Sequence, residues 1–420
     1  MFERLLNLKQ NGLRTQTALL IARLGTSGDV NYIAQNLPIS AVSASALDRT
    51  LFHGVLDILN IDHDEAGTGS PRWFFPWRDG GMGLTSIQHS ADALLLSSWL
   101  SGLERAAERF NYTSRIALID HLPPCAQLLN TLVQSLAAKG ADISSVESAL
   151  SQASETGLAS RLRLAACARS RQSFISGANS EDQVACNESG GKGAGAWLST
   201  PSKPSHWFTN QAFVSLVRLR MRLPVFSEDG LCLHRSKARP GVPPTLCSAT
   251  RDRFARHVML CQTGGGTLAR HNACRDMLAE AIIEHSGLPA PTEQHVSVYS
   301  DDRHPDIQFI DWRGREVHVD VEIVSPHDRA EVARTRPGAA IAAAEGVKRR
   351  KYARLNLMPA VAAHLGRPGN SLVTLVQSIC RQSDMTARSA AIASIWQDWS
   401  CTLQHWNAHI LSSAGSLMPP

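Results

Sequence analysis

The 420-residue sequence lacks the features that mark membrane-spanning or secreted proteins. It contains no run of about eighteen apolar residues, the length that a helix needs to span a bilayer. Its start, Met1-Phe2-Glu3-Arg4, has no signal peptide. Its nine cysteines are an odd number spread along the chain, which excludes a regular disulfide framework. These absences predict a soluble, intracellular protein in a reducing compartment, without a membrane partner.

Charge of either sign is also scarce, since 19% of the residues are charged and 43% are hydrophobic. This composition favours folded, core-burying structure, and the length leaves room for two or three domains. The net charge of +5 is too small to identify a polyanion partner. Two segments are more strongly basic: residues 232–275 hold eight Lys and Arg against one acid, and residues 334–354 hold seven against one.

A β-hairpin is predicted between these segments, at residues 306–323. The stretch 317–323 alternates apolar and polar side chains, which is typical of a half-buried strand. The stretch 306–311 is also strand-like. The loop Trp312-Arg313-Gly314 between them ends in glycine, as a three-residue hairpin loop prefers.

The hairpin brings acids together. Pairing Asp311 with Arg315 places Asp306 opposite Asp320, with Cβ atoms roughly 4.5–5.5 Å apart. Two carboxylates this close repel each other unless a cation lies between them, and hard oxygen ligands suit Mg²⁺ or Mn²⁺. Glu322 shares the face of Asp320. A two-residue loop would instead send Asp306 to the other face of the sheet.

A basic helix follows. Residues 339–355 are alanine-rich and favour a helix, on which Lys348, Lys351 and Tyr352 share one face. One lysine could orient or deprotonate an attacking water while the other stabilises charge on a scissile phosphate. The alternative is that the acids begin a turn and line a solvated strand face, and that the basic run is an exposed helix face.

These pieces together resemble a known family. Pro305-Asp306, Asp320-Val321 and the Lys-x-x-Lys-Tyr pattern at 348–352 are similar in order and separation to the restriction-like PD-(D/E)XK endonuclease of site-specific non-LTR retrotransposon proteins. The family's mode of action implies that the endonuclease nicks target DNA and frees a 3′ hydroxyl for reverse transcription. The implied partners are DNA and the element's RNA, and the implied location is the nucleus.

The resemblance also implies residue roles. The implied catalytic set is Asp306, Asp320, Glu322, Lys348, Lys351 and Tyr352. In it the two aspartates hold Mg²⁺, one lysine activates water, and the tyrosine orients a lysine or the phosphate. The glutamate stands where the family tolerates various residues.

A cysteine/histidine segment precedes the hairpin. His257-x-x-x-Cys261 has metal-ligand spacing, and Cys247 matches the first cysteine of the zinc knuckle that the family has here. The family's second cysteine is replaced by Thr250. Zinc would therefore need a substitute ligand from Cys232, His271 or Cys274. A metal-free remnant with buried thiols is the alternative.

The basic segments flank the expected active site, as phosphate-tracking surfaces would. Arg270-His271-Asn272 resembles the family segment that opens the first endonuclease helix, here 273–285, so His271 is structural or contacts phosphate. The residues expected to bind DNA are Arg251, Arg253, Arg256, Arg270, His271, Arg303, Arg349 and Arg350.

The first 176 residues are predicted to be helical. The turn from Phe75 to Leu84, entering a helix at 86–103, resembles the thumb and linker that follow the palm of non-LTR reverse transcriptases. Tyr299-Ser300-Asp301-Asp302 imitates a polymerase motif. However, a palm and fingers would have to precede the thumb, so we interpret it as an exposed turn.

The expected fold class is α+β: an all-helical thumb and linker region, then an α/β restriction-endonuclease-like core with a small mixed sheet. The expected segments are a thumb-like region at 1–115, a helical linker region at 116–176, a flexible linker at 177–205, a basic Cys/His segment at 206–275, an endonuclease-like core at 276–360 and a helical segment at 361–420. Two other functions stay open, a catalytically inactive nucleic-acid-binding remnant and a structural zinc-binding module.

Overall fold

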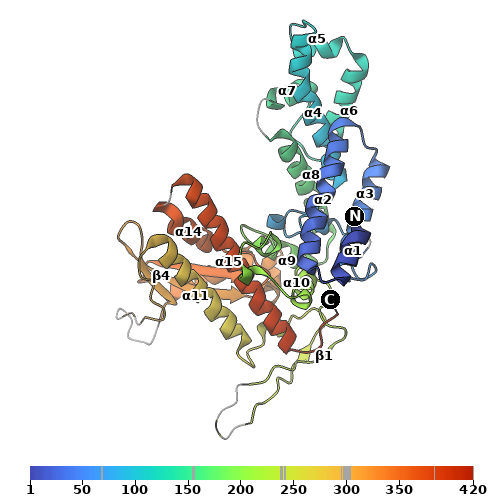
Figure 1. Ribbon diagram of the computed structural model, residues 1–420. Coiled ribbons are helices and arrows are strands. Elements are labelled where there is room, and N and C mark those ends of the chain that lie inside the picture. The colour runs from blue at the N-terminus through green and yellow to red at the C-terminus, as the bar shows by residue number, and fades with distance from the viewer. Residues whose placement is uncertain are drawn as a thin grey trace. The chain divides into compact units, whose positions relative to one another are not determined.

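A computed structural model describes residues 1–67, 70–153, 157–236, 240, 243–294, 296, 304–382 and 384–419 (Figure 1). The chain forms two compact units, one of residues 1–13, 18–76 and 83–177, the other of residues 14–17, 77–82 and 178–420. Helices with two small sheets, of two and three strands, make the protein α+β, as expected. None of the described helices combines the length and the apolar character that crossing a membrane requires.

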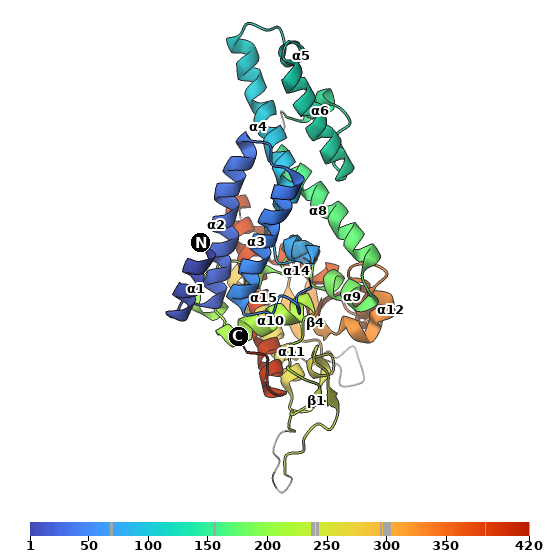
Figure 2. The same ribbon diagram turned by 90° about the vertical axis from the view of Figure 1, so that its right-hand side faces the viewer.

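The first unit is helical. The elements of this part of the chain are α1 Phe2–Gln10, α2 Thr15–Asn36, α3 Ala41–Leu59, η1 Pro71–Phe74, α4 Ile87–Arg109, α5 Arg115–Asp120, α6 Pro123–Ala138, α7 Val146–Ala153 and α8 Leu158–Gly177. The long helix α4 is central to this unit, since it contacts α3, α6 and α8 (Figure 2). It begins at Ile87 because the buried carboxylate of Asp48 accepts hydrogen bonds from the Ile87 amide and the Ser86 hydroxyl, at 2.6 and 2.7 Å. The expected segments 1–115 and 116–176 fall within this unit, except for residues 14–17 and 77–82.

The second unit holds both sheets. Its elements are η2 Trp77–Asp79, α9 Ser180–Glu188, η3 Ala196–Leu198, η4 Pro204–His206, α10 Asn210–Met221, β1 Gly230–Leu231, β2 Thr250–Arg251, η5 Val258–Leu260, α11 Gly266–Ser286, β3 Ile307–Ile310, β4 Glu316–Val324, η6 Pro326–Arg329, α12 Ala330–Ala333, α13 Ala339–Lys351, β5 Leu357–Ala363, α14 Asn370–Ile379, η7 Cys380–Gln382 and α15 Met385–Ser413. The predicted helix at 273–285 is longer than expected, since α11 starts at Gly266.

The three-stranded sheet has the order β3-β4-β5, with β3 antiparallel and β5 parallel to β4. Ile307 lies opposite Val319, and the Asp311 amide donates to the Arg315 carbonyl at 2.8 Å. Gly314 closes the loop with φ +73°. The predicted register is therefore confirmed. Other segments of the same chain hydrogen-bond to both outer strands. Residues 291–293 lie beside β3, and residues 367–369 lie beside β5.

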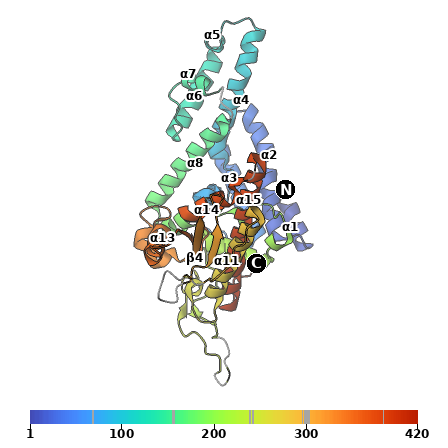
Figure 3. The same ribbon diagram turned by 90° about the vertical axis from the view of Figure 1, so that its left-hand side faces the viewer.

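Both faces of β4 are covered, so the prediction of a half-buried strand is wrong. Val317, Val319 and Val321 on one face pack with α11, α14 and α15 in the main core. The other face packs with α13, where Val324 and Val361 meet Ile341 (Figure 3). His318 and Asp320 on this face are therefore buried, at 3% and 4% exposure. The polar face is covered because α13, which follows later in the sequence, packs against it.

Residues 177–205, expected to be a flexible linker, are folded. α9 lies here, and Trp197 is 1% exposed. The glycines serve close packing, because a Cβ added at Gly193 or Gly195 would lie within 2.5 Å of Trp396 or Trp77, respectively. Composition suggested flexibility, but these glycines let the backbone pass against two tryptophan rings.

Asn407 of α15 links three parts of the second unit by hydrogen bonds. Its side-chain amide donates to the His364 carbonyl at 2.8 Å, just beyond β5, and its oxygen accepts from Arg270 of α11 at 2.9 Å. The Arg270 guanidinium also donates to the Met259 carbonyl at 3.2 Å. Asn407 is fully buried, so water cannot replace these bonds.

We expect Asn407→Leu to lower the free energy of unfolding by about 3 kcal/mol, because it leaves a buried donor on Arg270 and a buried acceptor on His364 without their partner. Urea unfolding of the full chain measures the change. The matched control is Ser412→Ala, an exposed position on the same helix, which should change stability by less than about 0.5 kcal/mol. Equal unfolding of Asn407→Leu and wild type would contradict the buried network.

Candidate functional site

The predicted acids and one predicted lysine meet beside the sheet. Asp320 and Glu322 lie on β4, and Lys348 lies on the last turn of α13. The Lys348 Nζ forms an ion pair with Asp320 and lies 3.4 Å from the Glu322 Oε2. The alternative interpretation required this polar strand face to be solvated. Instead, α13 covers it and supplies a cation that pairs with its acids.

Asp306 is fixed immediately before β3. Its Oδ2 accepts from the Val321 amide at 2.5 Å, two residues beyond Val319, which forms the last pair of the β3–β4 ladder. Its Oδ1 lies 3.2 Å from the Nε2 of His271 on α11. No sequence pattern predicts this second contact, because the two residues are 35 positions apart. The structure thus joins α11, β3, β4 and α13 at one site.

Burial and neighbouring charges act on both members of the ion pair. Burial raises the pKa of Asp320, and the nearby charge of Asp306 raises it further, while Lys348 opposes both. Burial by itself lowers the pKa of Lys348, but the charges of Asp320, Glu322 and Asp306 outweigh it and the pKa is raised. Asp320 loses more hydration, since its side chain is 5% exposed against 17% for Lys348. The charges of Asp306, Asp320 and Glu322 thus act on Lys348, and those of Lys348 and Lys351 act on Asp320.

Tyr352 and Lys351 lie beside this cluster. The buried Tyr352 hydroxyl donates to the His304 carbonyl at 2.9 Å, and so anchors the chain just before Pro305-Asp306. The Lys351 Nζ lies 4.6 Å from the centroid of the Tyr352 ring, and its side chain is exposed. Lys348 makes the ion pair with Asp320, and the charge of Lys351 also acts on Asp320.

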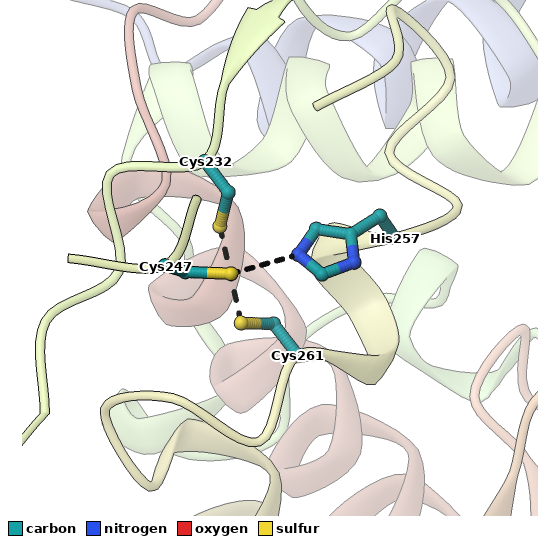
Figure 4. A group of neighbouring side chains, drawn as sticks. All are labelled: Cys232, Cys247, His257 and Cys261. Atoms are coloured by element: carbon teal, nitrogen blue, oxygen red, sulfur yellow. Dashed lines mark hydrogen bonds between the residues drawn. The ribbon is translucent and has the colours of Figure 1, made fainter. Parts of the chain in front are cut away.

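A second cluster lies in the cysteine/histidine segment (Figure 4). The ligand atoms of Cys232, Cys247, His257 and Cys261 all lie within 4.8 Å of one another, so the four residues could hold a metal ion. Cys232 is the substitute for the cysteine replaced by Thr250. The other two residues considered are elsewhere, since Cys274 is in the main core and His271 contacts Asp306.

The backbone positions these ligands. The Cys232 amide donates to the Ala249 carbonyl at 3.0 Å, and the Cys247 amide donates to the His234 carbonyl at 2.8 Å. The Cys247 Sγ lies 3.3 Å from the His257 Nε2. A backbone hydrogen bond at Ala249, with help from Cys261 and His257, lowers the pKa of Cys247 to about 6, while burial raises that of Cys232 to about 12.

Two of the arginines expected to bind DNA are interior. Arg251 is 7% exposed, lies over the Phe226 ring at 4.6 Å and donates to the Ala414 carbonyl. Arg270 is 2% exposed, and burial lowers its pKa to about 10. Both guanidinium groups bind backbone or Asn407, so the expectation that they face DNA is not met. Charge counting along the sequence cannot separate such structural arginines from surface ones.

The remaining cations have mixed surroundings. Arg256 is exposed and pairs with Glu181 at 2.7 Å, and Arg253 is half-buried. Arg349 and Arg350 are exposed on α13, where Arg349 also donates to the Ser371 hydroxyl at 2.5 Å. Arg303 lies outside the described residues, as does the segment Tyr299-Ser300-Asp301-Asp302.

The sequence matches no protein-family model and no curated protein significantly. Function must therefore be argued from the two clusters themselves.

We expect Lys348→Met to lower the free energy of unfolding by about 3 kcal/mol at pH 7, because it leaves Asp320 buried without its cation. The folded-state pKa of Asp320, already raised above 3.8, should then rise further. Since the folded state then binds more protons than the unfolded state, the loss should shrink as the pH falls from 7 towards 5. Denaturant titrations at several pH values measure both effects.

The matched control is Arg350→Met, which removes the same charge from an exposed position on the same helical turn. Its cost should be below about 1 kcal/mol and should not depend on pH in this range. A pH-independent loss in Lys348→Met would show that the ion pair does not stabilise Asp320.

Proposed function

We propose that the chain is a Mg²⁺-dependent DNA endonuclease with a restriction-like PD-(D/E)XK core, the C-terminal portion of a non-LTR retrotransposon protein. The enzyme nicks target DNA and frees a 3′ hydroxyl for reverse transcription. The observation that carries the proposal is the meeting of Asp306, Asp320 and Lys348, from three separate segments, at one place beside the sheet. Without that meeting, the sequence pattern would have no chemical meaning.

The donor set fits Mg²⁺ or Mn²⁺. Asp306, Asp320 and Glu322 supply hard carboxylate oxygens, which these ions prefer. The charges of all three act on the Lys348 ammonium group. When bound, the ion polarises the scissile phosphate as a Lewis acid.

Lys348 acts as a cation in this proposal and not as a base. Its raised pKa keeps the amine protonated at neutral pH, so it stabilises negative charge that develops on the phosphate. Exposed Lys351, Arg349 and Arg350 extend the basic surface along the same helical turn. Tyr352 and His271 are positioning residues, since one anchors the chain before Asp306 and the other contacts its carboxylate.

A second candidate is a catalytically inactive nucleic-acid-binding remnant. The observation that favours it is the ion pair between Lys348 and Asp320, which neutralises the buried acid without any other cation. In this case the exposed basic residues bind DNA or the element's RNA, and the acids only hold the fold together.

Plasmid nicking in Mg²⁺ separates the two candidates. We expect the full chain to convert supercoiled plasmid to the open-circular form, and Asp306→Asn or Asp320→Asn to slow this by roughly 100-fold, because each removes a metal ligand of nearly unchanged shape. DNA affinity should change little. Asp142→Asn, at an exposed position in the first unit, is the matched control and should nick at the wild-type rate.

If the two substituted proteins nick as fast as wild type, the carboxylates are wrongly assigned. If every version binds DNA and none nicks, the remnant is the correct interpretation.

We also propose that Cys232, Cys247, His257 and Cys261 bind a structural Zn²⁺. Three thiolates and one imidazole are a typical tetrahedral zinc set. Among the described residues between 230 and 261, the regular elements are the two-residue strands β1 and β2 and the short η5, so metal binding stabilises a region with little regular structure.

We expect about one zinc per chain in protein purified without chelators. Cys232→Ser should lose most of this zinc and lower the melting temperature, because three ligands remain. Cys125→Ala, which changes a cysteine of the first unit, should retain it. Elemental analysis measures zinc directly, and a zinc-free wild-type protein would overturn the site.

A further inference from the structure

An exposed tryptophan at the tip of the β3–β4 hairpin lies beside two arginines. Trp312 is 38% exposed. The guanidinium carbon of Arg313, its neighbour in the loop, lies 4.5 Å from the centroid of the Trp312 ring. That of Arg381, which comes from η7, lies 4.3 Å from the same ring. Two separate parts of the fold therefore bring positive charge to one aromatic side chain.

These two arginines differ from their neighbour Arg315. The Arg315 guanidinium donates to the Asp311 carboxylate at 2.7 and 3.0 Å, so its charge is matched. Among the residues that the structure describes, the guanidinium groups of Arg313 and Arg381 have no hydrogen bond and no ion pair. Both side chains are exposed.

The arrangement leaves the arginines ready for an anion. Stacking over an aromatic ring uses the flat face of a guanidinium and leaves the N–H donors at its edge free. Two cations near one ring also repel each other, and an anion bound between them would relieve that repulsion. Planar, bidentate donors of this kind suit phosphate oxygens.

We propose that Trp312, Arg313 and Arg381 form a clamp for the phosphate backbone of DNA, away from the scissile bond. The proposal rests on the proposed function. From Asp306 to Trp312 the chain advances six residues at roughly 3.3 Å each, which places the clamp about 20 Å from the carboxylates. That is about six nucleotides along a strand at 3.4 Å spacing, within the footprint of one bound duplex. Trp312 is a positioning residue that holds the two guanidinium groups together.

The test measures binding of the full chain to a labelled DNA duplex without Mg²⁺, over a range of NaCl concentrations. We expect Arg313→Gln/Arg381→Gln to weaken binding at least 10-fold and to reduce the slope of log K against log salt by roughly 1.8, because about two phosphate contacts are lost. Arg313→Lys/Arg381→Lys should restore the slope but not the full affinity, since lysine keeps the charge without the flat, bidentate group.

The matched control is Arg105→Gln/Arg109→Gln, which removes two exposed arginines of α4 that have no described partner. Its slope should equal that of wild type. Trp312→Leu keeps both charges, so it should weaken binding while leaving the slope nearly unchanged. The melting temperature of each variant is measured as a check on folding. It should equal that of wild type, because surface substitutions should not unfold the chain.

The clamp is overturned if the double glutamine variant keeps the wild-type affinity and slope. It is also overturned if Trp312→Leu weakens binding while the double glutamine variant does not, since the ring would then stack on bases. If the wild-type chain binds DNA but does not nick it, the proposed endonuclease function is wrong and the clamp proposal stands. If the chain nicks DNA and the substitutions at both arginines change neither binding nor nicking, only the clamp proposal is wrong. A wild-type chain that does not bind DNA overturns both.

Discussion

A carboxylate cannot be buried between a sheet and a helix unless a cation accompanies it. Asp320 is buried in this way, and the Lys348 ammonium is its partner. This requirement fixes the rotation of α13 about its axis, because the lysine must face β4. It also brings the end of α13 to the segment before β3, where Tyr352 donates to the His304 carbonyl. One ion pair thus sets the relative placement of the elements that carry the candidate nuclease site.

The cysteine/histidine cluster is connected to this site through the start of α11. Cys261 ends the η5 turn, and the Met259 carbonyl in that turn accepts from Arg270. The next residue, His271, contacts Asp306. A metal held by the cluster would therefore stabilise the turn from which α11 begins, and with it the helix face that supports the first carboxylate. The interior role of Arg270 explains why a basic residue in this segment does not add to the outer surface.

The features that could be predicted from the sequence are those with a local cause. The register of the hairpin follows from the alternation of residues 317–323 and from Gly314, so the placement of Asp306 opposite Asp320 was correct. The burial of Asp320 was not predictable in this way, because it depends on a helix that returns later in the chain.

Other features missed by the sequence depend on distant partners. The packing of Gly193 against Trp396 joins residues about two hundred positions apart, so its glycine looked like a sign of flexibility. Cys232 could be named only as one of three substitutes, since spacing does not reveal which loop approaches Cys247. The borders of the three-stranded sheet belong to the same class. Because residues 291–293 and 367–369 occupy the outer sides of β3 and β5, neither strand offers a long row of unpaired amides to another molecule. A partner that added a strand to this small sheet would first have to displace these two segments.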